Sequence, residues 1–179
     1  MKHIVLVSIL FVCFSVSLAE AQTQTEDRAS ALVEAKLKLK ELALLPEGLT
    51  VSHTPDPVLY TENPPSLSGV KWEHSTTVSS MSGPLIMVEF GYFVQRNGQW
   101  EYPYGVEVPY AYVSRDFAEK YDCPDSKLLP GKSYTDVRNR SVIDCVPEQV
   151  VKWYFIGEDI KGNRVKGEAS VQLVTELAE

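Results

Sequence analysis

The sequence predicts a mainly β protein, an antiparallel β-sandwich preceded by one helix, and two observations carry that prediction. From Gly48 onward, valines, threonines, aromatics and turn residues recur at short intervals, and no long helical period is present. Before Gly48, a charged and leucine-rich segment has apolar residues at three- and four-residue spacing. The number and spacing of the short strands are typical of two packed antiparallel sheets.

The first 21 residues have the layout of a cleaved secretory signal. A basic start precedes an apolar run from Ile4 to Val16, and small residues follow at Ala19 and Ala21. That run is too short and too near the terminus to favour a membrane span. We expect cleavage before Gln22, with cleavage after Ala19 as the alternative. The mature chain is therefore interpreted as exported, either secreted, periplasmic or at the cell surface, without a membrane span.

A helical segment over residues 22–47 is expected to connect the signal peptide (1–21) to a β domain at 48–179. The helix begins near Asp27, ends at Pro46, and carries one apolar stripe made of Leu32, Ala35, Leu39 and Leu42. Residues 37–40 also alternate, which leaves a strand as the alternative. The stripe fits packing against the rest of the domain, or a stalk or partner-binding helix.

Eight strands are expected in the β domain. They cover Leu49–His53, Val70–Ser79, Leu85–Gln95, Gln99–Tyr104, Tyr110–Ser114, Ser141–Val146, Gln149–Glu158 and Glu168–Thr175. Residues 56–65 are predicted to be a loop, because the paired prolines Pro64 and Pro65 exclude a central strand there.

The dipeptide Asn97-Gly98 predicts a hairpin, since both residues accept the positive φ values of a two-residue type I′ turn. In that register Arg96 faces Gln99, Gln95 faces Trp100, Phe93 faces Tyr102 and Gly91 faces Tyr104. Side chains alternate along a strand, so one face is expected to supply the core with Ile86, Val88, Phe90, Tyr92 and Val94.

The opposite face of this hairpin is the candidate binding site. Its ligand-binding residues are Phe93, Gln95, Trp100, Tyr102 and Tyr104, and Glu89 shares the face. Flat aromatic rings beside hydrogen-bonding groups suit stacking on a sugar ring or anchoring a protein partner. The alternative is burial, because the N-terminal helix must cover its own apolar stripe somewhere.

Two cysteines remain once the signal peptide has taken Cys13 with it. In an oxidising compartment, Cys123 and Cys145 are expected to form a disulfide. A loop of that length stabilises a fold by roughly 3 kcal/mol in the chain-entropy model. The alternative, a reactive thiol, needs one cysteine without a partner.

The triplet Asn139-Arg140-Ser141 matches the acceptor pattern for N-glycosylation. It lies in a polar stretch between the two cysteines, where exposure is expected. Export would bring Asn139 into the right compartment if the source is eukaryotic.

Catalytic and metal-binding signatures are not found in the sequence. The mature chain contains two histidines, His53 and His74, and neither has metal-ligand spacing. The hairpin register places Glu89 and Glu101 on opposite faces, which argues against their acting as a carboxylate pair. The net charge of −7 argues against nucleic acid and anionic membranes as partners. We therefore expect no enzyme activity, no metal and no cofactor.

The C-terminal hairpin, residues 150–176, resembles the last two strands of fibronectin type III and immunoglobulin-like modules. The matching residues are Tyr154, Ile156, Asp159, Gly162, Asn163, Val171, Leu173 and Thr175. Residues 129–134 look like the corner before the penultimate strand of the same modules. A long insertion at 115–128 and the cysteine pair depart from the fibronectin pattern. The resemblance implies an immunoglobulin-like sandwich and carries no binding residues with it.

These observations together predict an exported, disulfide-stapled β-sandwich that acts as an interaction or structural module. A carbohydrate-binding module that uses the aromatic face is the alternative. A secreted hydrolase is the third possibility.

Overall fold

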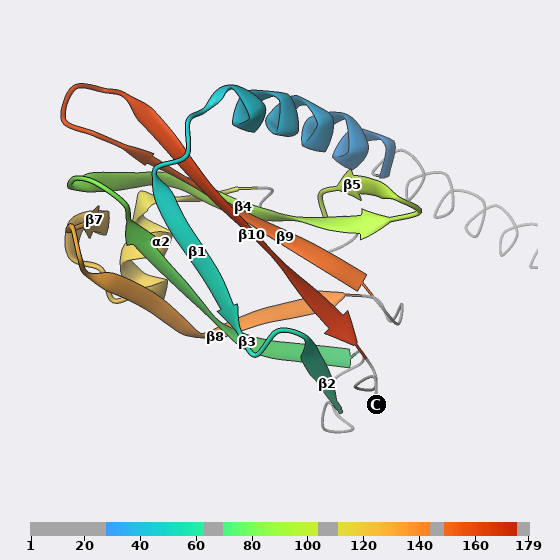
Figure 1. Cartoon of the computed structure of the whole chain (residues 1–179). Coiled ribbons are helices and arrows are strands. Elements are labelled where there is room, and N and C mark those ends of the chain that lie inside the picture. The colour runs from blue at the N-terminus through green and yellow to red at the C-terminus, as the bar shows by residue number, and fades with distance from the viewer. Residues whose placement is uncertain (1–27, 63–69, 104–110, 144–148, 175–179) are drawn as a thin grey trace, which may run out of the picture.

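The computed structural model describes residues 28–62, 70–103, 111–143 and 149–174, so the predicted signal peptide lies outside the described residues (Figure 1). It confirms a mainly β protein with one N-terminal helix, which covers residues 28–44. The strands are β1 (Leu49–Thr54), β2 (Val58–Glu62), β3 (Val70–Ser80), β4 (Leu85–Arg96), β5 (Gln99–Glu101), β6 (Tyr112–Val113), β7 (Lys127–Leu128), β8 (Ser133–Ile143), β9 (Gln149–Glu158) and β10 (Arg164–Val174). A short helix, α2 (Ser114–Lys120), and a 3-10 turn, η1 (Pro124–Ser126), lie between β6 and β7.

The strands are joined by hydrogen bonds in the order β1-β3-β2-β10-β9-β4-β5, with β8 beside β3 and the short β6 and β7 beside β4. β2 pairs with β10 in parallel and with β3 antiparallel, and so connects two groups of strands. The sheet curls, so that β1, β3 and β8 pass across one face of β4, β9 and β10 (Figure 1). The immunoglobulin-like sandwich implied by the resemblance is not confirmed by this arrangement.

The main core fills the inside of the curl. Its largest side chains are aromatic and include Phe90 from β4, Phe155 from β9 and Trp72 from β3. The rings of Phe90 and Phe155 are stacked with centroids 5.6 Å apart. α2 adds Phe117, whose ring packs edge-on against Phe90 at 5.7 Å. This helix therefore closes one side of the curl.

A second core lies on the outer face of the sheet, beneath the N-terminal helix (Figure 1). Ala35 and Leu42 of the predicted stripe are fully buried, and Leu32 and Leu39 are half-buried. The helix is thus preferred to the strand alternative at residues 37–40, and its stripe packs against the domain. Burial of an apolar face of this kind contributes roughly 25 cal/mol for each Å² removed from water.

The hairpin between β4 and β5 forms as predicted. Asn97 has φ of 51° and Gly98 has φ of 73°, the left-handed values that a type I′ turn requires. Gln95 pairs with Trp100, and Arg96 pairs with Gln99. The register of the first pairs is confirmed, while Tyr104 lies outside the described residues.

The predicted core face of β4 is correct only in its second half. Phe90, Tyr92 and Val94 enter the main core, but Ile86 is exposed and Val88 packs on the helix side. The cause is a β-bulge, because the register with β9 shifts between Met87 and Glu89. An extra residue reverses the alternation, so Leu85 and Met87 replace Ile86 and Val88 in the main core.

Other elements also differ from the sequence-based expectation, and β2, α2 and β8 are the clearest cases. β2 (Val58–Glu62) forms inside the predicted loop at 56–65. α2 (Ser114–Lys120) begins at the end of the strand predicted for 110–114 and buries only Phe117, so it is too short to show a helical period. β8 (Ser133–Ile143) begins eight positions before the predicted Ser141, because an irregularity in its pairing with β3 breaks the alternation by which strands are recognised.

Candidate functional site

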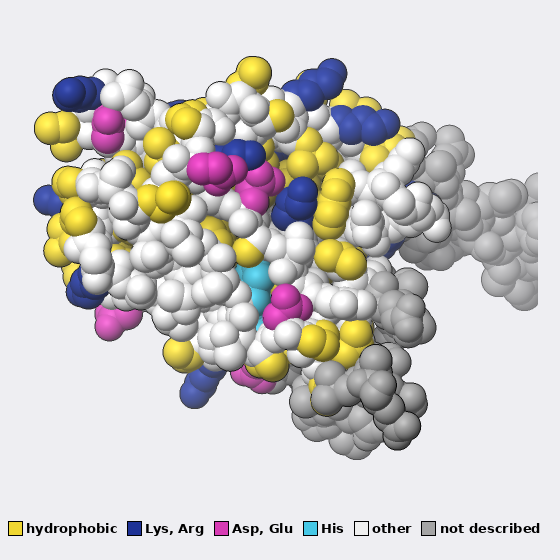
Figure 2. Space-filling view, in the orientation of Figure 1, with side chains coloured by type: hydrophobic (Ala, Val, Ile, Leu, Met, Phe, Trp, Pro, Cys, Tyr) yellow, Lys and Arg dark blue, Asp and Glu magenta, His cyan; other side chains and the backbone are white. Residues whose placement is uncertain are grey.

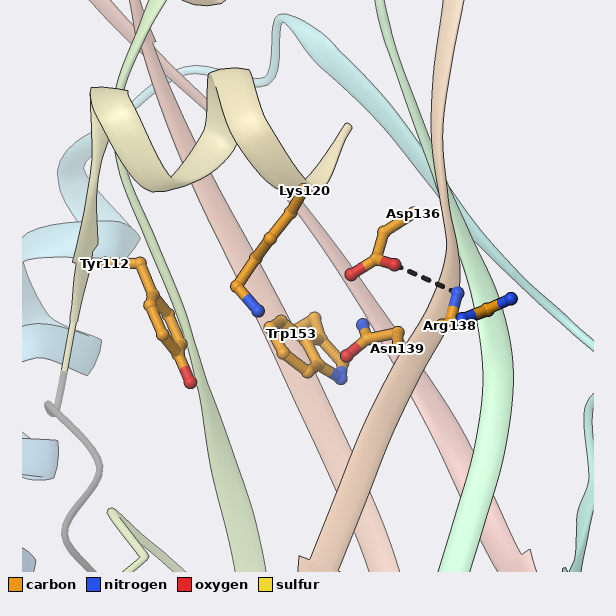
Figure 3. Close-up of a pocket in the computed structure, with 6 residues that line it drawn as sticks. All are labelled: Tyr112, Lys120, Asp136, Arg138, Asn139 and Trp153. Atoms are coloured by element: carbon orange, nitrogen blue, oxygen red, sulfur yellow. Dashed lines mark hydrogen bonds between the residues drawn. The ribbon is translucent and has the colours of Figure 1, made fainter. Parts of the chain in front are cut away.

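A cavity of about 290 Å³ opens into the side of the main core, and we call it the β8 pocket (Figure 3). The end of α2 lies over it, β8 forms one wall, β6 the opposite wall, and β9 the floor. Six residues line the pocket: Tyr112, Lys120, Asp136, Arg138, Asn139 and Trp153. Its volume is near the lower end of the range, roughly 300 to 1,000 Å³, that small-molecule sites occupy.

The β8 wall presents a carboxylate and an amide. The register of β8 against β3 shifts between His74 and Thr76, and this irregularity allows both Asp136 and Asn139 to face inward. Asp136 Oδ1 accepts a hydrogen bond of 3.0 Å from the backbone N–H of Arg138. Asn139 Nδ2 donates to Thr76 Oγ1 at 2.7 Å. The second carboxylate oxygen of Asp136 and the amide oxygen of Asn139 remain as acceptors for a further donor.

The floor of the pocket is Trp153, which is only 3% exposed. Its ring packs against Tyr92 with centroids 4.8 Å apart. Among the described residues, its indole nitrogen Nε1 has no hydrogen-bond partner. A buried donor without a partner costs about 1 to 3 kcal/mol, and native proteins leave few of them. Trp153 Nε1 therefore has an unused hydrogen bond at the pocket.

The third wall carries Lys120 from α2 and Tyr112 from β6. The Lys120 side chain descends toward the floor, with Nζ 5.4 Å from the centre of the Tyr112 ring (Figure 3). Tyr112 is itself stacked on Phe90 at 4.9 Å, which fixes its ring against the core. Burial, followed by the charge of Asp116, raises the pKa of Tyr112, so its hydroxyl stays protonated at neutral pH.

Two histidines, His53 and His74, lie next to the β8 wall of the pocket. His74 faces Asn139 in the register of β3 with β8, and its ring packs edge-on against His53 with centroids 5.2 Å apart. Both ring nitrogens of His74 lack a partner within the described part of the chain. Burial, and next the nearby His53, lowers the pKa of His74 to about 4. Histidine surface is visible near the middle of the face in Figure 2, beside an acidic side chain.

The predicted aromatic binding face is part of the second core, beneath the N-terminal helix. Phe93 is fully buried and Tyr102 is 3% exposed, and both pack under the N-terminal helix with Ala31 and Ala35. The expectation of an exposed platform is therefore wrong for Phe93 and Tyr102. The physical reason is the alternative considered from the sequence, burial under the N-terminal helix. The apolar stripe of the helix packs against these two rings.

Two other predicted binding residues keep part of their surface. Gln95 and Trp100 are half-buried at the end of the hairpin, and Tyr104 lies outside the described residues. Lys152 Nζ lies 4.8 Å from the centre of the Trp100 ring. This ring is thus covered on one side by a neighbouring strand residue.

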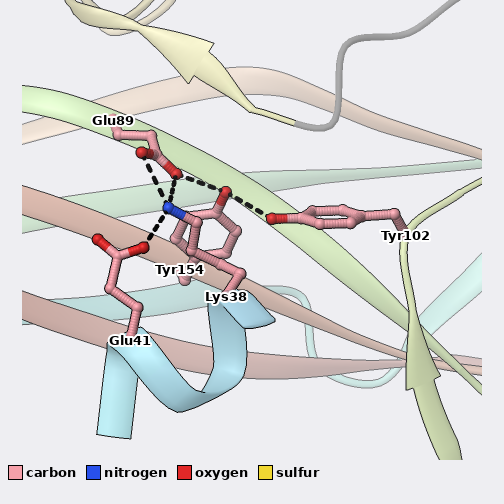
Figure 4. Close-up of polar contacts among 5 residues, drawn as sticks. All are labelled: Lys38, Glu41, Glu89, Tyr102 and Tyr154. Carbon is pink, nitrogen blue, oxygen red and sulfur yellow. Dashed lines mark hydrogen bonds and ion pairs between the residues drawn. The ribbon is translucent and has the colours of Figure 1, made fainter. Parts of the chain in front are cut away.

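Polar groups on the helix side are bonded to one another (Figure 4). Lys38 Nζ forms ion pairs with Glu89 Oε1 at 2.9 Å and with Glu41 at 2.6 Å. The Tyr154 hydroxyl donates to Glu89 Oε1 at 2.9 Å and lies 3.2 Å from the Tyr102 hydroxyl. Burial raises the pKa of Tyr154 far above its ordinary value, so it acts as a donor. This network holds the helix on the sheet.

The buried carboxylate Glu101 also has a structural role. Its two oxygens bond Arg28 of the N-terminal helix at 3.3 Å and Arg96 of β4 at 3.2 Å. Glu101 is 1% exposed, and a carboxylate buried to that degree needs such partners. It therefore ties the helix to the hairpin.

The predicted glycosylation site is not available in the folded protein. Asn139 is 5% exposed, and the amide nitrogen that would carry a glycan is bonded to Thr76 inside the core. Glycosylation of Asn139 stays a prediction, and the structure argues against it because the irregularity in β8 turns Asn139 inward. The predicted disulfide stays a prediction, since Cys145 lies outside the described residues while Cys123 is buried.

Sequence reasoning did not find the residues of the β8 pocket as a site. Tyr112, Lys120, Asp136 and Trp153 come from four separate elements, and no local motif connects them. Asn139 was noticed only for its triplet. The one sequence feature that could have indicated this site is Asp136, near the start of a strand rich in polar residues. A strand that faces solvent has the same pattern, so this feature does not identify a site.

Further properties of the described residues narrow the chemistry. No three histidine, cysteine, aspartate or glutamate side chains within the described ranges gather as metal ligands do. None of the helices in this part of the chain has the length and apolar character of a membrane span. The sequence matches no protein-family model and no curated protein.

Proposed function

We propose that this chain is an exported protein that acts by binding, and that it holds a small polar ligand in the β8 pocket. The observation that carries the proposal is the buried indole N–H of Trp153, a residue that lines the open β8 pocket, for which no hydrogen-bond partner exists among the described residues. The export signal in the sequence supports action outside the cytoplasm. This proposal therefore replaces the binding site expected from the sequence, on the aromatic face of the hairpin, with one on the inner side of the sheet.

A ligand-observed NMR screen with small polar fragments tests this proposal. Lys120→Trp places a large ring at the end of α2, where the native side chain reaches into the pocket. Lys36→Trp makes the same change on the exposed outer side of the N-terminal helix. Fragments that bind the parent and Lys36→Trp but not Lys120→Trp support the proposal. Fragments that bind all three equally, or no binding to the parent at all, contradict it.

Association through the N-terminal helix is a second candidate, and its occupant would be another copy of this chain. Val33, Leu37 and Leu44 lie on one outer stripe of the helix and are 55%, 56% and 85% exposed. Lys36 and Glu41 flank this stripe on opposite sides, so two helices packed in parallel would bring opposite charges together. Sedimentation of the parent and of Leu37→Glu tests it, because only the parent is expected to dimerise.

A further inference from the structure

We propose that the ligand of the β8 pocket is a small zwitterion, with a free α-amino acid as the simplest case. This inference rests on the proposed function. It is carried by two charges of opposite sign on different walls of one cavity, the carboxylate of Asp136 and the ammonium of Lys120 (Figure 3). These two groups are not paired with each other, so each is available to a ligand group of opposite charge.

The Asp136 wall requires a cation. Asp136 is 9% exposed, and no lysine, arginine or histidine of the described residues forms an ion pair with it. Its one hydrogen bond comes from the backbone of Arg138, whose side chain extends away from the pocket (Figure 3). A buried carboxylate without a counter-charge is costly. A ligand ammonium that donates to Asp136 and to the amide oxygen of Asn139 would supply the missing charge.

The other wall and the floor require an acceptor. Lys120 offers an ammonium that can turn toward a ligand, and the floor offers the Trp153 N–H, which lies at the Asn139 end of the ring and has no partner among the described residues. A carboxylate accepts hydrogen bonds from both kinds of donor, and charge strengthens these bonds relative to neutral ones. The two ends of an α-amino acid thus match the two walls in sign and in hydrogen-bonding role.

Other small ligands satisfy only part of the site. A neutral sugar could bond Trp153 and Asn139 but would leave both charges without a counter-charge. A simple anion would satisfy Lys120 and would be repelled by Asp136. The cavity of about 290 Å³ has room for one amino acid but not for a folded peptide segment.

Isothermal titration of the full mature chain with the common L-amino acids, one at a time, tests the proposal. D-glucose and acetate serve as the neutral and anionic probes. The best-binding amino acid is then compared with its N-acetyl and its carboxamide derivative, each of which removes one charge. We expect each derivative to raise Kd at least tenfold, and glucose and acetate to bind at least tenfold more weakly than the amino acid.

Two pocket variants and one matched control locate the binding. Asp136→Asn and Lys120→Gln should each raise Kd for the amino acid at least tenfold, whereas Lys36→Gln should leave it within twofold. If a pocket variant fails to fold by circular dichroism, the derivative series on the parent still decides. Equal binding of the amino acid and both derivatives overturns the proposal.

The failure of this inference differs from failure of the proposed function. One outcome is that no amino acid binds, while other fragments bind the parent but not Lys120→Trp. In that case the zwitterion proposal is wrong and the pocket still binds ligands. If no fragment and no amino acid binds the parent, both are wrong.

Discussion

Two neighbouring residues on β9 point to opposite sides of the sheet and meet different surroundings. The Tyr154 hydroxyl on the helix side donates to Glu89 at 2.9 Å and lies beside the Tyr102 hydroxyl. The Trp153 N–H on the inner side has no partner among the described residues. Both side chains are almost fully buried, so burial alone does not distinguish them. The difference is one of hydrogen bonding: the buried hydroxyl on the helix side has partners within the chain, while the buried N–H on the inner side has none among the described residues.

The same contrast applies to charges. Glu89 and Glu101, which both bond cations of the N-terminal helix, have these partners within 3.3 Å. On the inner side, Asp136 has no cationic partner in the described part of the chain. We therefore expect loss of these ion pairs with the helix to lower stability, and substitution of Asp136 on the inner side to weaken ligand binding.

The largest effect is expected from truncation of the second core. Phe93→Ala should lower the free energy of unfolding by about 3 to 5 kcal/mol, because a fully buried ring is lost beneath the helix. Ile160→Ala, which truncates an apolar side chain that is 92% exposed, should change it by less than about 0.5 kcal/mol. Urea denaturation measures both. A Phe93→Ala protein as stable as the parent would show that the helix does not pack as described.

The second effect is a loss of stability in acid. The folded pKa of His74 is lowered to about 4, whereas the unfolded pKa is 6.5. Between these values the unfolded chain binds a proton that the folded chain does not. The contribution of His74 to the free energy of unfolding is therefore complete above pH 6.5 and is lost as pH falls toward 4, by about 3 kcal/mol. Urea midpoints of the parent and of His74→Gln from pH 7 to 4 should converge, and parallel curves would contradict the prediction.

A smaller effect compares the same change on the two faces. Tyr154→Phe removes a hydroxyl that donates to a carboxylate, and should cost about 1.5 to 3 kcal/mol. Tyr92→Phe, on the inner face of β4, removes a hydroxyl for which the structure gives no hydrogen bond, and should cost less than about 0.5 kcal/mol. Thermal and urea unfolding of the two variants measure the difference. Equal losses would remove the contrast between the faces.

The smallest effect concerns the hairpin that places Phe93 on the helix side. Gly98→Val puts a β-branched residue at φ of 73°, and should cost about 1 to 2 kcal/mol. An added Cβ there meets no atom within 4 Å, so the cost is one of backbone conformation. Gly83→Val is the matched control, since its Cβ is equally unobstructed and its φ is not left-handed. Unfolding curves that coincide for both variants would show that the turn is not type I′.

The sequence by itself determined the elements that depend on local chemistry. The spacing of Ala35 and Leu42 defines a helix with one buried stripe, and Asn97-Gly98 defines a turn with its register. The predicted bounds of β9 (Gln149–Glu158) are the observed ones, because its hydrophobic run is interrupted only by Lys152. The mainly β class follows from these elements and from the repeated turn residues.

Only the tertiary structure decided which surfaces are buried. Alternation assigns residues to two faces but does not tell which face the chain covers, and in β4 both faces are covered. Two pairing irregularities reverse the alternation, one between Met87 and Glu89 in β4 and one between Asp136 and Asn139 in β8. The β8 pocket depends on the second irregularity and on contacts between residues far apart in the chain. Such contacts arise only when the sheet curls, and so they leave no local pattern in the sequence.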